Sequence, residues 1–396
     1  MKAMALRSGK LRIDQIPDPT PENGQVIVKS LACCICASDL HMVHHADRLA
    51  AWSRDNDGPF NFDPDEDIVL GHEFCGEIVE LGPNTSDSYA IGDRIVSSPI
   101  LFTNSGFAVL GYSNDYPGAF GEYLALSESL LLPVADHIPT SIASLMEPLS
   151  VGVQYARIAN IGEAETPLVI GCGAIGLAVI AAMHANGISP IVASDFSPFR
   201  REMAVAMGAT EVVDPNEEDP MNRWRQCAPM GHGCVIIECV GAPGLLGEIF
   251  VTAPWSSRII VAGQNLEDDV MFTASAHTKG LNVQFGGSPI PDDYATALQA
   301  ITEGTIDVSL WQTGHAGSEP RQEQEDGRKG GQRHLASAPV SGRSVPQRST
   351  RRRNDLLAVN ARYQHHHRRR AGSGAVAGEW DSAALHHRLA DHRTAP

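Results

Sequence analysis

Four side chains of the kinds that bind zinc lie in the first 150 residues: Cys36, His72, Glu73 and Glu147. Catalytic zinc takes sulfur, nitrogen and oxygen ligands and keeps one position open for water or substrate. A cation there lowers the pKa of a bound alcohol and prepares hydride departure. Alternatives stay open, because a buried cysteine can be a small hydrophobic side chain, Glu147 can simply begin a helix, and Cys33 with Cys36 can form a redox pair.

A glycine-rich loop, Gly171-Cys172-Gly173-Ala174-Ile175-Gly176, follows an expected strand and opens an expected helix. The first glycine permits a tight turn, the second lets the backbone approach a pyrophosphate, and the third lets the helix pack on the strand. The helix N-terminus adds free N–H groups and a positive dipole. This context favours dinucleotide binding over an ordinary turn between a strand and a helix.

Asp195 ends the next expected strand, 19 residues after Gly176. A carboxylate at this place accepts hydrogen bonds from ribose hydroxyls and repels a 2′-phosphate, so NAD is favoured over NADP. Arg200 and Arg201 follow closely and could accommodate that phosphate, or they are solvated helix charges.

These groups must be positioned by two different kinds of structure. Residues 1–31, 68–80 and 93–98 read as strands, and Pro and Gly residues through 54–118 indicate long loops on a barrel-like sheet. Residues 141–161 have helical periodicity. Further along, strands predicted at 167–171, 190–194, 234–238, 258–262 and 282–286 alternate with helices predicted at 174–186, 198–207, 243–252 and 291–303. The sequence therefore predicts an α/β chain, with a β-rich part followed by a doubly wound parallel sheet.

Composition narrows the function classes. The 396 residues are 43% hydrophobic and 19% charged, as in soluble globular proteins. No secretory signal or membrane span is visible, and eight cysteines without such a signal predict reduced thiols in a cytoplasm. Residues 1–311 carry 15 Lys and Arg against 39 Asp and Glu, which disfavours nucleic-acid binding by the main body.

The amino-acid composition changes near Gln312. Residues 312–396 hold fourteen Arg and one Lys but no Ile, Phe, Met or Cys, and half of all the histidines. We predict a largely irregular basic tail over 311–396, and its composition is typical of out-of-frame translation of a GC-rich gene. A solvated tail and a metal-chelating or RNA-binding arm are the alternatives.

Five motifs in this order resemble those of the zinc-dependent medium-chain dehydrogenases, the relatives of alcohol, sorbitol and threonine dehydrogenases. They are Cys36-Ala37-Ser38-Asp39-Leu40-His41, Gly71-His72-Glu73, Gly92-Asp93-Arg94, Glu147-Pro148-Leu149-Ser150 and the glycine loop. The resemblance covers about residues 1–310. It implies a GroES-like catalytic domain over 1–150 and a Rossmann domain over 151–310, with the active site in the cleft between them.

The resemblance also implies residue roles. Cys36 and His72 would bind zinc, and Glu73 would bind or approach the metal as water exchanges. Glu147 stands where the polyol and threonine branches carry a Glu, which favours polyols, amino alcohols or other secondary alcohols. Ser38 and His41 would relay the alcohol proton outward; otherwise they are a turn hydroxyl and a surface histidine.

Two segments depart from the family pattern. Residues 99–115 contain no cysteine, so we predict one catalytic zinc and no structural zinc. The stretch 42–67 is longer than in many relatives. It would line the substrate pocket with Trp52, Phe60 and Phe62, or form an acidic surface loop.

The sequence thus predicts a zinc- and NAD-dependent dehydrogenase acting on a small alcohol or its ketone, without a nucleic-acid or membrane partner. Relatives commonly form homodimers or homotetramers. A zinc-free NAD(P)H quinone or enoyl reductase is one alternative. A nucleotide-binding protein without turnover, because of its altered C-terminus, is the other.

Overall fold

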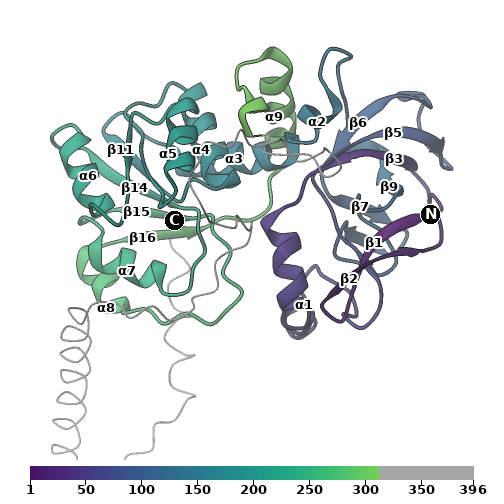
Figure 1. Cartoon of the computed structure of the whole chain (residues 1–396), viewed down its shortest axis with the longest axis horizontal. Helices are drawn as coiled ribbons and strands as arrows, with labels where there is room; N and C mark the ends of the chain where they lie inside the picture. Colours follow the sequence, from purple (N-terminus) through teal and green to yellow (C-terminus); the bar gives the residue numbers. More distant parts are fainter. Residues whose placement is uncertain (312–396) are drawn as a thin grey trace, which may run out of the picture. The chain divides into compact units, whose positions relative to one another are not determined.

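The computed structural model describes residues 1–311, which belong to one compact unit (Figure 1). The tail predicted over 311–396 lies outside the described residues, apart from Trp311. Within residues 1–311, no helix has the length and apolar character needed to cross a membrane.

The first part is β-rich, as predicted. Its strands are β1 (Lys2–Arg7), β2 (Lys10–Gln15), β3 (Gln25–Cys33), β4 (Ile68–Val69), β5 (Phe74–Leu81), β6 (Arg94–Ser97), β7 (Ile100–Thr103), β8 (Gly106–Val109), β9 (Tyr123–Ser127) and β10 (Leu131–Pro133). They form sheets in the orders β10-β6-β5-β3-β9, β2-β1-β4 and β7-β8. A 3₁₀ turn, η1 (Glu128–Leu130), joins β9 to β10.

A long helix, α1 (Ala37–Asp55), covers residues 42–55 of the stretch 42–67, so the alternative of a surface loop is wrong for that part. Met42, Ala46 and Leu49 recur at helical spacing and are buried, so this face packs into the β-rich part. Polar residues between them hide the pattern in the sequence. The helix is kinked at His45, whose φ is −133°.

The second part alternates strands and helices, as predicted. Its elements are α2 (Thr140–Ala143), α3 (Met146–Ala159), β11 (Glu165–Ile170), α4 (Ala174–Ala185), β12 (Val192–Ser194), α5 (Pro198–Ala206), β13 (Glu211–Val213), α6 (Pro220–Cys227), β14 (Gly233–Glu238), α7 (Leu245–Thr252), β15 (Arg258–Val261), α8 (Thr273–Lys279), β16 (Asn282–Phe285), α9 (Pro291–Glu303) and η2 (Val308–Trp311). The strands pair in parallel in the order β13-β12-β11-β14-β15-β16. The predicted doubly wound sheet is thereby confirmed, while β13, α6 and α8 went unpredicted.

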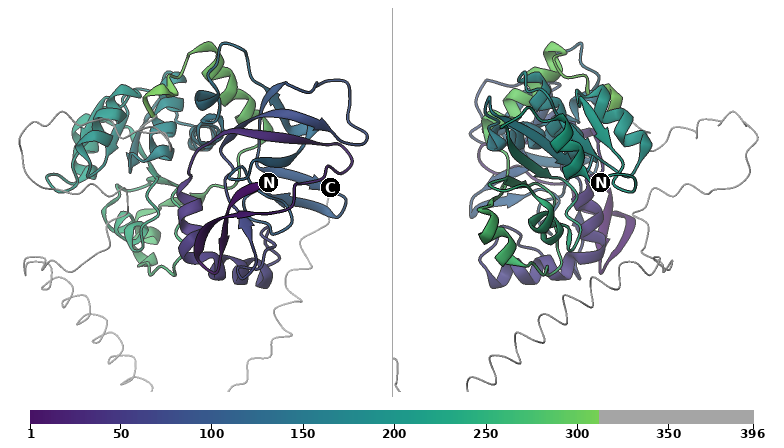
Figure 2. Two further views of the ribbon diagram at one scale, coloured as in Figure 1. Left: turned by 45° about the vertical axis from the view of Figure 1, so that its right-hand side comes forward. Right: turned by 90° about the vertical axis from the view of Figure 1, so that its left-hand side faces the viewer.

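Helices cover both faces of this parallel sheet (Figures 1 and 2). Val169 on β11 packs in the cluster that includes α3 and α4, whereas its neighbour Leu168 packs with α6 and α7. Successive strand residues point to opposite faces, so near-continuous apolar strands are needed.

One hydrophobic core runs from the β-rich part into the parallel-sheet part. Cys75 on β5 and Val96 on β6 belong to the same cluster of buried residues as Met146 on α3 and Val169 on β11. Helix α2 contacts β5 and α9, and α3 contacts α4 and α9. The two parts therefore share a packed interior over residues 1–311.

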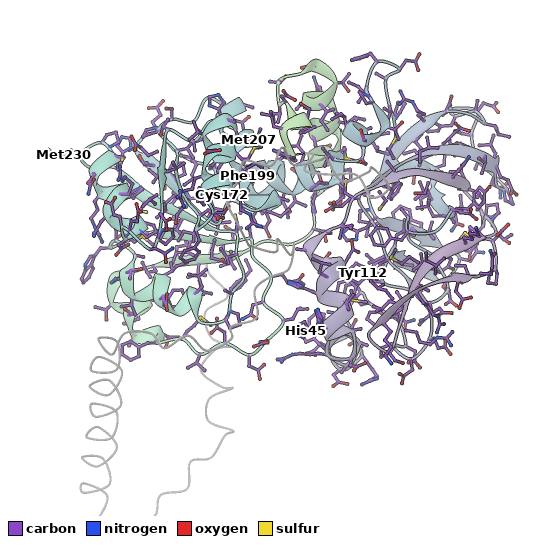
Figure 3. The ribbon with its side chains drawn as sticks, in the orientation of Figure 1. His45, Tyr112, Cys172, Phe199, Met207 and Met230 are labelled. Atoms are coloured by element: carbon purple, nitrogen blue, oxygen red, sulfur yellow. The ribbon has the colours of Figure 1, made fainter. Side chains whose placement is uncertain are left out.

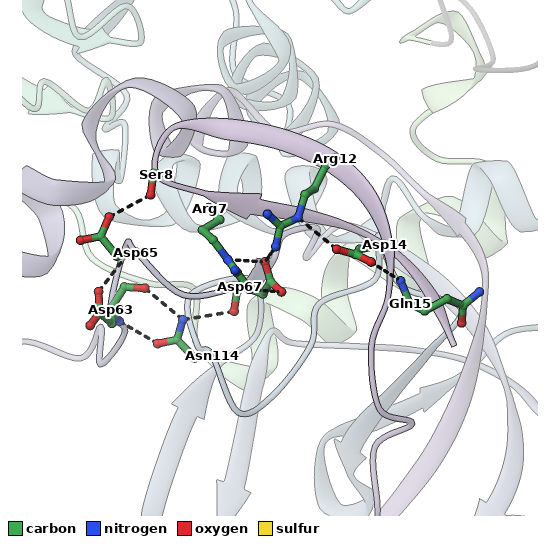
Figure 4. Close-up of polar contacts among 9 residues, drawn as sticks. All are labelled: Arg7, Ser8, Arg12, Asp14, Gln15, Asp63, Asp65, Asp67 and Asn114. Atoms are coloured by element: carbon green, nitrogen blue, oxygen red, sulfur yellow. Dashed lines mark hydrogen bonds and ion pairs between the residues drawn. The ribbon is translucent and has the colours of Figure 1, made fainter.

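A polar network anchors the segment that leads into β4. Asp67 accepts hydrogen bonds from Arg7 on β1, at 2.6 Å, and from Arg12 on β2, at 2.5 Å (Figure 4). The side-chain amide of Asn114 donates to the carbonyls of Asp63 and Asp67, both at 3.1 Å. These contacts, of which the two to the Asp67 carboxylate are charge-assisted, hold the chain just before Gly71 and His72.

Candidate active site

Three of the predicted metal ligands come together from distant parts of the chain. Cys36 is the N-cap of α1, in the short connection from β3, while His72 and Glu73 lie between β4 and β5. One ligand atom from each of Cys36, His72 and Glu73 lies within 4.8 Å of the other two. His72 and Glu73 are buried, so this group of sulfur, nitrogen and oxygen donors is suited to a zinc ion.

The Asp39 carboxylate holds the residues of this group in position. Its Oδ1 lies 3.5 Å from Nδ1 of His72, its Oδ2 accepts a hydrogen bond from the Cys36 backbone N–H, and Oδ1 also accepts one from the Gly71 N–H. A carboxylate beside one ring nitrogen leaves Nε2 of His72 to face a metal. The sequence placed Asp39 within a motif but gave it no role, because its contact with His72 spans 33 positions.

The buried acidic groups of this cluster favour the binding of a cation. Burial raises the pKa of Cys36, Glu73 and Glu147. Burial lowers the pKa of His72, but hydrogen bonds to Asp39 and Cys36 outweigh it, and the pKa lies well above its usual value. Closely spaced buried acids compete for too little positive charge, and a divalent cation would relieve this.

Glu147 approaches from another element. It lies in the first turn of α3, is 8% exposed, and lines the same pocket as Cys36 and His72. It is separate from the compact group of three ligand atoms. Glu147 therefore faces the cluster from the parallel-sheet side, where it can serve as a further or exchangeable oxygen ligand.

Ser38 and His41 lie one turn apart on α1, and both line the pocket. The Ser38 Oγ is 3.4 Å from Nε2 of His72. The Nδ1 atom of His41 is buried without a hydrogen-bond partner, and burial lowers the pKa of this ring, with help from His45 and His44. A hydroxyl beside the metal group and a neutral imidazole further out could pass a proton toward solvent.

The pocket has a volume of about 680 Å³ and draws its lining from both parts of the chain. Phe60, Tyr112 and His72 form an aromatic series, with ring centroids 4.9 Å apart for Phe60 and Tyr112 and 5.9 Å apart for Tyr112 and His72 (Tyr112 is marked in Figure 3). Of the wall residues suggested by sequence, Phe60 lines the pocket. Phe62 packs in the core instead, and Trp52 does not line this pocket either, so these two assignments are wrong.

The glycine loop has distinct steric demands at each glycine. Gly171 has φ of +90°. A Cβ on Gly176 would lie 1.9 Å from the Gly171 carbonyl oxygen, whereas a Cβ on Gly173 would meet nothing within 4 Å. Gly176 is thus needed for packing, while Gly173, at the N-terminus of α4, leaves open space where a phosphate could approach the backbone. Ala174 and Ile175 form the first turn of that helix.

The Asp195 carboxylate stabilises the same loop through a hydrogen bond. Its Oδ2 accepts a hydrogen bond from the Cys172 N–H, at 2.8 Å, and its Oδ1 accepts one from the Ser197 N–H, also at 2.8 Å. Arg200 Nη1 lies 3.8 Å from Oδ2, and the guanidinium of Arg201 bonds the carbonyls of Asp195 and Phe196. Each carboxylate oxygen keeps a lone pair for a ribose hydroxyl.

Where the family pattern places a cysteine-rich lobe, the structure has a β-hairpin. Strands β7 and β8 pair from Ile100–Val109 to Thr103–Gly106. The side chains of this hairpin reach the pocket at Ile100, Phe102, Phe107 and Val109, which sequence patterns did not indicate.

Comparison with known proteins gives a consistent result. The alcohol dehydrogenase GroES-like domain matches residues 22–136, and the zinc-binding dehydrogenase family matches residues 174–304. The (R,R)-butanediol dehydrogenase of Bacillus subtilis is 34% identical over 273 residues, which are 66% of this chain and 77% of that protein. The sorbitol dehydrogenase of the same organism is 24% identical over 78% of this chain and 88% of its own.

Solved structures agree on the architecture. The 2R,3R-butanediol dehydrogenase from Bacillus subtilis superimposes with a TM-score of 0.64 at 27% identity, covering 78% of this chain and 90% of that one. A zinc-binding dehydrogenase from Sinorhizobium meliloti, solved bound to NADP, gives a TM-score of 0.64 at 23% identity, over 78% of this chain and 90% of its own.

Proposed function

This chain belongs to the zinc-dependent medium-chain dehydrogenases, and on that premise we propose that it oxidises a secondary alcohol with NAD, using one catalytic zinc ion. The observation that carries the proposal is the convergence of Cys36, His72 and Glu73, from the start of α1 and the β4–β5 connection, at the pocket that Glu147 lines. Secondary alcohols are favoured because relatives of this chain are diol, polyol and threonine dehydrogenases.

Cys36, His72 and Glu73 would hold the metal, with Glu147 as a further or exchangeable ligand. When bound, zinc lowers the pKa of the alcohol and NAD accepts the hydride. Asp39 would hold the His72 ring so that its Nε2 atom faces the ion, and Cys36 would be held by its backbone bond to Asp39.

The proton would leave through this chain's own side chains. Ser38 Oγ would accept the alcohol proton, and His41 would receive it further along α1. The lowered pKa of His41 keeps its ring neutral and able to accept a proton near neutral pH.

The glycine loop and Asp195 would bind NAD. The α4 N-terminus and Gly173 would hold the pyrophosphate, and the buried Asp195 carboxylate would accept from the adenosine ribose. Like charge at Asp195 would disfavour the 2′-phosphate of NADP, while Arg200, 3.8 Å away, offers that phosphate a partner. The domain boundary at residue 150 and the assembly of this chain into a homodimer or homotetramer remain predictions.

The test is the metal content of the purified full-length chain, measured by atomic emission beside His72→Ala and His277→Ala. We expect about one zinc per chain in the parent, with loss in His72→Ala. His277 is exposed on α8, so His277→Ala should keep its zinc. Folded parent protein without zinc, or unchanged NAD-linked alcohol oxidation in zinc-free protein, would refute the proposal.

A further inference from the structure

Resting on the proposed function, we infer the substrate class: an uncharged secondary alcohol with a bulky apolar group, such as an aryl or branched alkyl group. The inference comes from the chemical character of the pocket beyond the metal group. It narrows the broad range of polyols, amino alcohols and other secondary alcohols that the sequence suggested.

In the β-rich part of the chain, most of the polar residues that line the pocket lie at the catalytic end. Cys36, His72 and Glu147 belong to the metal group, and Ser38 and His41 to the proposed proton path. These groups are committed to the reacting carbon, oxygen and hydrogen atoms. Of the other polar lining residues, Tyr112 has its ring beside His72, and Gln264, Ser288 and Tyr294 belong to the part of the chain that would bind NAD. In the β-rich part, Ser98 is then the one polar lining residue away from the catalytic end.

Much of the remaining lining from the β-rich part is apolar. It comes from α1, the segment after α1, the β7–β8 hairpin and the end of η1: Met42, Leu49, Pro59, Phe60, Ile100, Phe102, Phe107, Val109 and Leu130. The hydroxyl of a polyol placed against these side chains would lose its hydrogen bonds to water without replacement, which is costly. An apolar group placed there would instead be removed from water.

Charge complementarity points the same way. Among residues 1–311, the side chains lining the pocket include no Lys or Arg, and Glu147 is their one carboxylate. A substrate carboxylate or phosphate away from the metal would therefore have no Lys or Arg side chain in the pocket to pair with. An amino acid, a sugar acid or a sugar phosphate is disfavoured on this ground.

The β7–β8 hairpin supplies the distinctive part of this wall. Phe102 and Phe107 line the pocket, yet they remain 50% and 56% exposed. They are cross-strand partners, so the two rings present one apolar edge. An apolar substituent on the substrate would cover surface that these rings otherwise expose to water.

The experiment compares kcat/KM for NAD-linked oxidation of 1-phenylethanol, 2-propanol, sorbitol and threonine by the full-length zinc-loaded chain. We expect 1-phenylethanol to exceed both sorbitol and threonine by about 100-fold or more. Phe107→Ser should lower kcat/KM for 1-phenylethanol by about tenfold, mainly through KM, and lower that for 2-propanol by a smaller factor. Trp255→Ser, which removes a similarly exposed aromatic ring outside the pocket, should change neither.

Two results would overturn the inference in distinguishable ways. A higher kcat/KM for sorbitol or threonine than for 1-phenylethanol would refute the substrate class and leave the dehydrogenase function standing. No turnover of any alcohol would refute both. Binding gives a second readout: acetophenone should compete for the enzyme–NADH complex more tightly than dihydroxyacetone, and Phe107→Ser should reduce that difference.

Discussion

Asp39 and His72, 33 positions apart in the sequence, meet with Oδ1 3.5 Å from Nδ1 inside the metal group. The Asp39 side chain is 3% exposed and also holds the backbone of Cys36 and Gly71. One carboxylate thus fixes the two segments that supply the three clustered ligands.

Replacing this carboxylate should weaken metal binding. Asp39→Asn keeps the size of the side chain but removes its charge and one acceptor, so we expect zinc affinity to fall by about 10- to 100-fold. Competition with a chromogenic chelator measures this. Asp47→Asn, an exposed change on the same helix, is the control. Equal zinc affinity in Asp39→Asn and parent would show that Asp39 does not orient the ligands.

The proton path predicts a particular pH dependence. The pKa of His41 is lowered by burial and by His45 and His44, and its neutral form accepts the proton. Alcohol oxidation should therefore persist below pH 6.5 and decline only when His41 becomes protonated. His41→Ala should lower kcat by about 100-fold and remove that acid limb, whereas the exposed His277→Ala on α8 should do neither. A profile that His41→Ala leaves unchanged would contradict the relay.

Two glycine-to-alanine substitutions in the glycine loop should affect different properties. Gly176→Ala forces a Cβ to within 1.9 Å of a backbone oxygen, so we expect the free energy of unfolding to fall by about 3 kcal/mol. Gly173→Ala meets no protein atom within 4 Å and has φ of −71°, so Tm should hold while NADH affinity falls. Thermal unfolding and NADH fluorescence measure the two effects. Equal NADH affinity in Gly173→Ala would place the pyrophosphate elsewhere.

Cofactor choice should depend on Asp195. Asp195→Ser removes the charge that repels a 2′-phosphate, and we expect the affinity for NADPH relative to NADH to rise about tenfold. Because Asp195 also accepts from Cys172 N–H, Tm should fall somewhat as well. The double variant Asp195→Ser with Arg200→Ala should lose the gain for NADPH. A parent enzyme that already prefers NADPH would disprove the assignment of NAD.

The sequence predicted those features that are encoded locally. β11, the glycine loop and α4 have apolar runs and turn residues within a short window, and their limits were predicted to within two residues. Helix α1 was misjudged because the polar side chains around Met42, Ala46 and Leu49 obscure its apolar face. The role of Asp39 and the hairpin wall at Phe102 and Phe107 arise from contacts between distant segments. No local pattern contains that information.

The continuous interior of residues 1–311 has a consequence for how the molecule unfolds. Since Cys75 and Val96 share one buried cluster with Met146 and Val169, the β-rich part cannot lose its packing without exposing apolar surface on the parallel-sheet part. Heat denaturation of this body should follow a single cooperative transition rather than two. A substitution such as Val96→Ala should then lower the melting temperature of the metal group and of the nucleotide loop together, although Val96 belongs to neither.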